Sequence, residues 1–478
     1  MNTAGFISFT PYALLAFGSV GLLMAGAFAR SLSHRVMNLA GAAVAGLAGA
    51  SALLPRLQIN EISGFIAIDG LARIFTATVS FTAAVVLLLS VGYTARRPLG
   101  DEEFPSLVLF AAFGMAVLVS TSSLLGVFLG LECMSIALYV LLASNKSDYN
   151  SGEAGLKYLV IGAISTAFFA YGLALIYCAS GSLSIGPAFS ALTRGGGMDP
   201  LGMAGWAMLL VGIGFKTSLF PFQFWAPDVY QGGPSPVTAF LSTASKASVF
   251  VVLLRFAAAS QQGWHVVAPV LWVMAVLTMV FGNIAALKQA DIKRLLAYSS
   301  IAQMGYVLLA VIASPVSGQA AAVFYLITYI AMELGAFGVI ASFSTGAREF
   351  GDIERLKGLG YVHPMRAAAL AVCFISLAGL PPTAGFMGKF GVFNASLKAE
   401  YVGLSVIGLV TAIISVYYYL RVVVNMYMKR EDDYPAAGPL VPAHDTSGRL
   451  AVWLSVAAVI IFGIIPAGLL DYIDAALK

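Results

Sequence analysis

Long apolar stretches recur along this chain, and they constrain its fold more than any other feature. A helix needs about 20 apolar residues to cross the hydrocarbon of a bilayer. Hydrophobic residues make up 60% of the chain and charged residues only 10%, whereas a soluble chain carries roughly 25% charged residues. We therefore predict an all-α polytopic membrane protein with about 14 transmembrane helices. Their expected centres are Phe17, Val44, Phe81, Phe113, Tyr139, Phe168, Leu210, Leu241, Thr278, Met304, Ile330, Leu377, Ile413 and Val459.

The basic residues between these stretches predict the orientation of the chain. Loops that contact the cytoplasm are enriched in Lys and Arg. The opposite loops and the C-terminal tail carry only Arg56, Arg194, Lys398 and Lys478. An even number of spans then places both termini on the outer, periplasmic side of a bacterial inner membrane. The loops predicted to be inside carry Arg30, Arg35, Arg96, Arg97, Lys146, Lys288, Lys293, Arg294, Arg348, Arg355, Lys357, Arg366, Lys429, Arg430 and Arg449.

The cysteines and histidines indicate no cofactor in this chain. Cys133, Cys178 and Cys373 lie far apart in apolar stretches, and no Cys-x-x-Cys pattern is present. Zinc and iron–sulfur sites need clustered ligands, so we expect neither here. The four histidines fall in predicted loops or at segment ends, which disfavours a haem ligand pair. The basic residues form no single patch, so nucleic-acid binding is not expected either.

Two of the predicted spans contain prolines and have a lysine close by. Pro221 interrupts the seventh span beside Lys216, and Pro381–Pro382 interrupts the twelfth span near Lys389. Proline breaks a helix, and irregular backbone at membrane depth is tolerated only where it is buried in protein or lines a cavity. We therefore predict discontinuous helices at both places, with a polar space around each lysine.

A weak internal similarity accompanies the two breaks. YLVIGAISTAFFAYG from Tyr158 is similar to YLITYIAMELGAFG from Tyr325. Repeats of five helices would have opposite topologies, which is typical of transporters with binding sites at broken helices. We predict two inverted five-helix repeats, and chance similarity of apolar segments remains the alternative. The expected parts of this single membrane domain are 1–100 (helices 1–3), 101–260 (helices 4–8), 261–430 (helices 9–13) and 431–478 (inner loop and helix 14).

Several charged residues fall inside the predicted spans, where they are costly and usually functional. Glu132 and Lys246 lie too deep to reach an interface easily. Lys216 and Lys389 are close to the helix breaks. Lys157 could instead form an ion pair with Glu153 at the inner side. The candidate site residues are Glu132, Lys157, Lys216, Lys246 and Lys389, with Glu333 as a possible addition that could also be part of a structural ion pair.

A row of such groups favours proton transfer. Burial penalises the charged form of a lysine, and a carboxylate about 4 Å away restores roughly 4 kcal/mol at an effective dielectric constant near 20. Making or breaking a contact between Glu and Lys would therefore load or empty the lysine. Lysines joined by water could relay protons across the membrane.

Four stretches resemble one family closely. GLECMSIALYVLLAS, GFKTSLFPFQFWAPDVYQGGPSPVTAFLSTASK, QADIKRLLAYSSIAQMGY and GLPPTAGFMGKF are similar to the antiporter-like subunits of respiratory complex I. The resemblance extends from about residue 60 to residue 430. Within that superfamily the chain resembles the subunit N type of bacterial NADH–quinone oxidoreductase, because it is of modest length, lacks a long C-terminal lateral helix and has Lys389 where the subunit M type has glutamate.

The resemblance implies a membrane-arm subunit of an enzyme complex that translocates protons. It implies that Glu132 pairs with Lys216, that Lys246 is the central relay, that Lys389 is the relay toward the outer side and that Lys157 is auxiliary. Flavin and iron–sulfur clusters would belong to partner subunits. The expected partners are another antiporter-like subunit, a small helical subunit and lipids.

The chain departs from the family pattern at Gln223, where the family commonly has a histidine. The resemblance does not place Glu333 in the family path. A hydrogen-bonding role at Gln223 could survive, but a protonatable role could not. Two alternatives remain open at this point. The chain could be a subunit of a multisubunit Na⁺/H⁺ antiporter or membrane-bound hydrogenase, or it could be a scaffold that pumps nothing.

Overall fold

The fold is described from a computed structural model of the chain. It describes residues 8–29, 32–54, 59–62, 65–97, 99, 103–196, 199–344, 349–429, 442 and 445–477. Among the basic loop residues used to predict orientation, Arg30, Arg56, Arg348, Arg430 and Lys478 lie outside these ranges.

The structure confirms an all-α membrane fold. In the described part of the chain, 13 spans are long and apolar enough to cross a membrane, and the shorter apolar helix α17 belongs to a fourteenth, discontinuous span. Every predicted centre falls inside one of these spans. The spans are α2 Thr10–Phe28, α3 His34–Leu53, α4 Gly70–Thr94, α5 Glu103–Ser120, α6 Leu124–Leu142, α7 Tyr149–Ser180, α9 Pro200–Thr217, α11–α12 Ser235–Ala259, α13 Gln261–Ala286, α14 Ile292–Ile312, α15 Gln319–Phe343, α17 Pro364–Ala378 with α18 Ala384–Lys398, α19 Val402–Tyr427 and α20 Thr446–Ile464.

Short elements connect the spans at the two ends of the bundle. The strands β1 Ile59–Ile62 and β2 Ile66–Ile68 pair in antiparallel orientation. The helical connections are α8 Ile185–Ser190, η1 Ala191–Gly196, η3 Ser314–Gly318, η4 Glu354–Leu356 and α16 Leu359–Val362, and α21 Ala467–Leu477 follows the last span.

Both predicted helix breaks are present. Helix α9 ends at Thr217, and Ser218 takes the left-handed conformation with φ of 58° before α10 Trp225–Gly232 begins. Helix α17 ends at Ala378, and Gly379 takes the left-handed conformation with φ of 82° before α18 begins. In each case an X-Pro segment follows the left-handed residue, and proline cannot continue a helix.

The eighth span contains an irregularity that the sequence did not predict. Its helix α11 Ser235–Phe240 passes into a π-helical turn, η2 Leu241–Ser245, before α12 Lys246–Ala259. A π turn inserts an extra residue into a helix and is frequent at functional sites. The turn ends directly at Lys246, one of the candidate residues.

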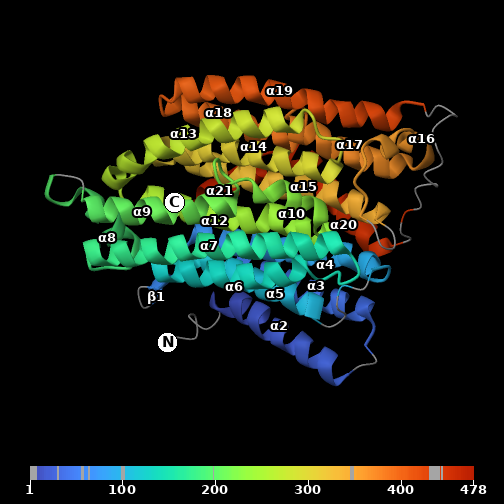
Figure 1. Cartoon of the computed structure of the whole chain (residues 1–478), viewed down its shortest axis with the longest axis horizontal. Coiled ribbons are helices and arrows are strands. Elements are labelled where there is room, and N and C mark those ends of the chain that lie inside the picture. Colours follow the sequence, from blue (N-terminus) through green and yellow to red (C-terminus); the bar gives the residue numbers. More distant parts are fainter. Residues whose placement is uncertain are drawn as a thin grey trace.

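The helices lie side by side along the long axis of the molecule, with α2 at the lower edge of the view and α19 at the upper edge (Figure 1). Helix α20 returns from the end of the chain to pack on α4, α15 and α18. The spans formed by α11–α12, α14 and α15 are almost entirely buried. Of the candidate residues, these three central spans carry Lys246 and Glu333. The predicted division into repeats stays a prediction.

Candidate functional site

Lys216 occupies the last turn of α9 and is almost fully buried. Its Nζ donates hydrogen bonds to Ser135 Oγ at 2.7 Å and Tyr139 Oη at 3.4 Å, both on α6. The rings of Tyr139, Tyr158 and Phe215 lie with their centroids 5.2 to 5.4 Å from Nζ. Aromatic faces attract a desolvated cation, so this environment accepts the ammonium group without a carboxylate in contact.

The expected contact between Glu132 and Lys216 is absent. Glu132 accepts a hydrogen bond from Thr166 Oγ1 at 2.7 Å. Ser135, which holds the lysine, lies three residues further along α6, about one helical turn away. Glu132 still lies near enough for its negative charge to act on the ammonium group of Lys216. Glu132 therefore influences Lys216 from a distance and does not form a salt bridge with it.

Lys246 is fully buried at the start of α12. Its Nζ donates to Ser300 Oγ on α14 at 2.8 Å and lies 5.3 Å from the centre of the Tyr230 ring. Ser300 also accepts a hydrogen bond from Tyr329 Oη on α15 at 2.8 Å. One serine hydroxyl thus joins the lysine to the neighbouring span α15.

Glu333 belongs to this cluster. It lies one turn beyond Tyr329 on α15, it is fully buried, and neither oxygen of its carboxyl group has a hydrogen-bond partner among the described residues. Its charge acts on Lys246. An unpartnered buried carboxyl group is costly and calls for a functional or solvent-linked explanation. Tyr325, Tyr329 and Glu333 recur every four residues, and this spacing could have located Glu333 on the face toward Lys246.

Lys389 lies in α18, beyond the second helix break, and is buried. Its Nζ reaches back to donate to the carbonyl oxygens of Leu377 at 2.8 Å and Ala378 at 3.3 Å, at the end of α17. Unpaired carbonyls and the helix dipole make a helix C-terminus attractive to a cation. A Cβ atom at Gly379 would lie 2.8 Å from Lys389 Cδ, so glycine leaves room for this contact.

Helix α14 connects the sites of Lys246 and Lys389. Gln303 follows Ser300 by one turn, and its Nε2 donates to the carbonyl oxygen of Leu377 at 2.9 Å. This is the same carbonyl that accepts from Lys389. Ser300 is hydrogen-bonded to Lys246, and Gln303 shares the Leu377 carbonyl with Lys389. One turn of α14 separates Ser300 from Gln303, so polar groups extend from one lysine to the other.

Lys157 lies apart from this row. Its side chain is 39% exposed, and its Nζ contacts Glu153 Oε1 and Asp228 Oδ2, each at 2.7 Å. Asp228 also pairs with Arg294 at 2.7 Å. Burial raises the pKa of Asp228, but the hydrogen bonds from Lys157 and Arg294 outweigh it and hold the pKa below its usual range. This setting favours the structural ion pair over an auxiliary relay.

A buried ion cluster at the predicted inner end was not found from the sequence. Glu349, just beyond α15, contacts Arg97 at 2.7 Å and Lys293 at 3.3 Å and accepts a hydrogen bond from Ser235. Burial raises the pKa of the Glu349 carboxyl, but the positive charges of Lys293 and Arg97 lower it by more. The pKa of Glu349 therefore lies below its ordinary value. Arg97 and Lys293 looked like solvated loop charges, yet both are only 1% exposed.

Polar atoms without partners also occur at the first helix break. Both amide atoms of Gln223 and the hydroxyl of Ser218 are buried and have no hydrogen-bond partner among the described residues. The hydrogen-bonding role expected of Gln223 is therefore not made with protein groups. Buried polar groups of this kind are usual places for ordered water.

Comparisons with known proteins show the family to which the chain belongs. Residues 121–415 match the model of the family described as NADH:quinone oxidoreductase/Mrp antiporter, transmembrane. The chain belongs to this family of transmembrane subunits. Within it, the chain is 43% identical over its whole length, and over the whole length of the relative, to NADH-quinone oxidoreductase subunit N of Geotalea uraniireducens.

Solved structures show the same fold. A chain of respiratory complex I from Thermus thermophilus with bound aureothin is 36% identical, with a TM-score of 0.79, covering 96% of this chain and 98% of that one. A chain of an archaeal membrane-bound sulfane sulfur reductase has a TM-score of 0.84 at 24% identity, covering 100% of this chain and 97% of that one. The fold is thus shared beyond complex I, and only the sequence identity places the chain near subunit N.

Proposed function

We propose that this chain is a proton-translocating subunit of the membrane arm of an NADH:quinone oxidoreductase. The observation that carries the proposal is the setting of Lys216, Lys246 and Lys389. All three are buried, and within the described structure none of them forms a salt bridge. A buried cation held only by neutral groups has no fixed counter-charge, so its protonation responds strongly to charges nearby.

The route that we propose follows this row. Protons pass from Lys216 to Lys246 and from Lys246 along Ser300 and Gln303 to Lys389, the residue toward the outer side. Glu333 exchanges a proton with Lys246 in this proposal, because it is the buried carboxyl group whose charge acts on that lysine and its oxygens have no hydrogen-bond partner among the described residues by distance and angle. Water would complete the gaps, since hydrogen-bonded water conducts protons where side chains do not meet.

The rest of the complex supplies the energy in this proposal. Flavin and iron–sulfur clusters are placed in partner subunits, and another antiporter-like subunit and a small helical subunit are placed beside this chain. The orientation with both termini on the periplasmic side of a bacterial inner membrane is supported by the bias of basic residues toward alternate loops. The high identity with subunit N favours this function over a Na⁺/H⁺ antiporter or hydrogenase subunit.

The test is Lys246→Ala in the assembled complex, reconstituted into vesicles, with NADH oxidation and pH-gradient formation recorded together. Both rates should fall while the complex remains assembled. Lys288→Ala is the matched control, because it removes an exposed lysine from the loop after α13. If Lys246→Ala keeps both rates at the wild-type level, the central relay is wrong and a scaffold role is favoured.

A further inference from the structure

Each of the three buried lysines of the proposed route lies over the face of a tyrosine ring. Lys246 Nζ is 5.3 Å from the centre of the Tyr230 ring, and Lys389 Nζ is 5.2 Å from the centre of the Tyr306 ring. Lys216 has two tyrosine rings at similar distances. The face of an aromatic ring carries partial negative charge and attracts a cation within about 6 Å of its centre. The recurrence at all three lysines suggests that the rings act on their protonation.

Tyr306 is held in place from two neighbouring helices. It is fully buried in α14. Its hydroxyl accepts a hydrogen bond from Asn283 Nδ2 on α13 at 3.0 Å and donates one to Thr411 Oγ1 on α19 at 3.3 Å. Asn283 is fixed in turn, because its Oδ1 accepts a hydrogen bond from Tyr418 Oη at 3.1 Å. The proposed route uses none of these polar groups, yet together they fix the ring against the lysine.

Lys389 depends on its ring more than the other two lysines do. The charge of Glu132 acts on Lys216, and the charge of Glu333 acts on Lys246. Within the described structure, no carboxylate acts on Lys389 in this way. Its hydrogen bonds go to two backbone carbonyl groups at the end of α17. The face of the ring is therefore the further group that favours the charged form of this lysine.

The titratable side chains that the packed helices bring to this site are tyrosines. Tyr306 comes from α14. Tyr325 on α15 and Tyr419 on α19 both form hydrogen bonds with Gln303, whose carbonyl partner also accepts from Lys389. Tyrosine ordinarily ionises near pH 10, at about pKa 10, so these groups are neutral at neutral pH. The helix α17 contributes its two carbonyl groups.

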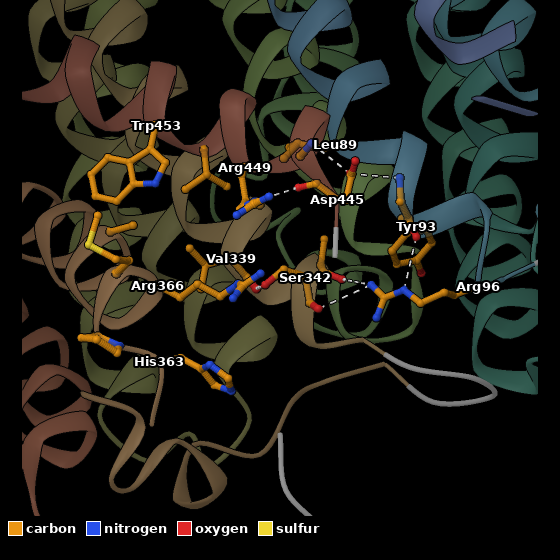
Figure 2. Close-up of a pocket in the computed structure, with 18 of the residues that line it drawn as sticks. Leu89, Tyr93, Arg96, Val339, Ser342, His363, Arg366, Asp445, Arg449 and Trp453 are labelled. Carbon is orange, nitrogen blue, oxygen red and sulfur yellow. Dashed lines mark hydrogen bonds between the residues drawn. The ribbon is translucent and has the colours of Figure 1, made fainter. Parts of the chain in front are cut away.

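Cations at the predicted inner end of the bundle are held differently. Figure 2 shows a pocket of about 290 Å³ there, with arginines in its wall. Arg96 donates hydrogen bonds to the carbonyl oxygens of Ala341 and Ser342. Arg449 donates to the carbonyl oxygen of Asp445. An arginine keeps its charge in proteins, so its surroundings do not set its protonation. A buried lysine can lose its charge, so the ring beside it can set that balance.

We propose that Tyr306 sets how readily Lys389 binds a proton, because its ring face stabilises the ammonium form. The inference rests on the proposed function, since it requires Lys389 to be a relay. In the relay step the neutral amine of Lys389 takes up a proton from the side of α14 and becomes an ammonium group, which then releases the proton toward the outer side. A desolvated cation over a ring gains enough to change the ratio of charged to neutral lysine about tenfold.

The test weakens the ring face without changing its shape. Phenylalanine and phenylalanines with increasing numbers of fluorine atoms are incorporated at position 306 of the assembled complex in vesicles, because fluorine withdraws negative charge from the face. The rate of pH-gradient formation is measured from mildly acidic to alkaline pH. Tyr306→Phe keeps the face and should resemble the wild type. The alkaline pH at which the rate falls to half should decrease with each added fluorine, by about one pH unit over the series.

The same fluorine series at Phe256 is the matched control. Its buried ring packs on Phe189 and Trp206 in another part of the bundle, so the pH profile should not move. A profile that stays constant along the series at position 306 would overturn the proposal, because a ring that only fills space tolerates fluorine.

Lys389→Ala separates this inference from the proposed function. If Lys389→Ala stops proton translocation while the fluorine series has no effect, the route stands and the role of Tyr306 is wrong. If Lys389→Ala translocates protons like the wild type, the proposed route fails at this residue and the inference fails with it.

Discussion

Two regions of the molecule bury lysines in opposite ways. At the predicted inner end, Lys293 is buried against the carboxylate of Glu349, which also holds Arg97. In the middle of the bundle, Lys216, Lys246 and Lys389 are buried against hydroxyl groups, carbonyl groups and aromatic rings. A paired buried charge is fixed in place, whereas an unpaired one depends on its surroundings. We call the ion cluster of Arg97, Lys293 and Glu349 the clamp, because its charges are fixed by pairing. Lys216, Lys246 and Lys389 form the lysine row, whose charges can change.

The lysine row itself divides into two halves. From Lys246 to Lys389 the polar groups of α14 form a connection through Ser300 and Gln303. Between Lys216 and Lys246 lie the rings of Tyr158, Trp225 and Tyr230, which contact one another. Rings pack but do not pass protons along their faces. Both halves therefore need water to pass a proton, and the first half has fewer polar side chains to hold that water.

Removing the carboxylate of the clamp should have the largest effect. Glu349→Gln leaves Arg97 and Lys293 buried without a counter-charge, and breaking a buried pair in this way costs about 3–5 kcal/mol. We expect a marked loss of thermal stability of the assembled complex in detergent. Glu354→Gln, in a nearby exposed position, is the control. If the complex with Glu349→Gln is as stable as the wild type, the ion pairs of Glu349 do not stabilise the fold and the contrast with the lysine row is wrong.

Acid should weaken the same clamp. The pKa of Glu349 is lower in the folded protein than its usual value, so its contribution to stability is complete above the ordinary glutamate pKa of about 4.3. That contribution is lost as the pH falls through the lower value of the folded state. Thermal unfolding measured from neutral to acidic pH should show this loss in wild type. Glu349→Gln should lack it, and an identical acid profile in both proteins would contradict the assignment.

Interrupting the α14 connection should affect transport more than stability. Gln303→Leu keeps the volume of the side chain but removes its hydrogen bond to Leu377. We expect proton translocation to fall about tenfold, which corresponds to ~1.4 kcal/mol in the barrier. Gradient formation in vesicles measures this effect. Asn38→Leu, which removes a buried amide on α3 far from the row, should leave transport unchanged, and equal losses in both variants would indicate a general packing defect.

The second helix break offers a smaller effect. Gly379→Ala places a side chain at φ of 82° and within 2.8 Å of Lys389 Cδ. We expect a loss of about 1–2 kcal/mol in stability from the backbone conformation, with displacement of Lys389. Gly391→Ala, whose new Cβ would lie 3.8 Å from its nearest neighbour, is the control in α18, the helix that carries Lys389. Gly379→Ala should unfold at a lower temperature and form a smaller pH gradient than Gly391→Ala.

The sequence predicted those parts of the site that contrast with their surroundings. Lys216, Lys246 and Lys389 stand out because a lysine in an apolar stretch is rare and costly. The breaks of the seventh and twelfth spans were also predictable, because Pro221 and the pair at 381–382 cannot continue a helix. These features are local, so the chain itself reveals them.

The remaining parts depend on contacts between distant segments. Glu349 lies in a polar loop, where a carboxylate gives no signal, and only the packing of α11 and α14 against that loop buries it. The distance between Glu132 and Lys216 depends on which turn of α6 faces α9. The sequence pointed to Glu153 as a partner of Lys157 but not to Asp228, which is 71 residues away. The π turn before Lys246 has no proline or glycine to announce it.

The carbonyl of Leu377 accepts hydrogen bonds from both Gln303 and Lys389. A carbonyl oxygen has two lone pairs, and here both are engaged. When the lysine gains or loses its charge, the bond order of this one C=O group changes. Its stretching vibration is therefore a built-in reporter of the charge on Lys389, and a carbon-13 label at Leu377 would make the state of the last relay visible in an infrared spectrum.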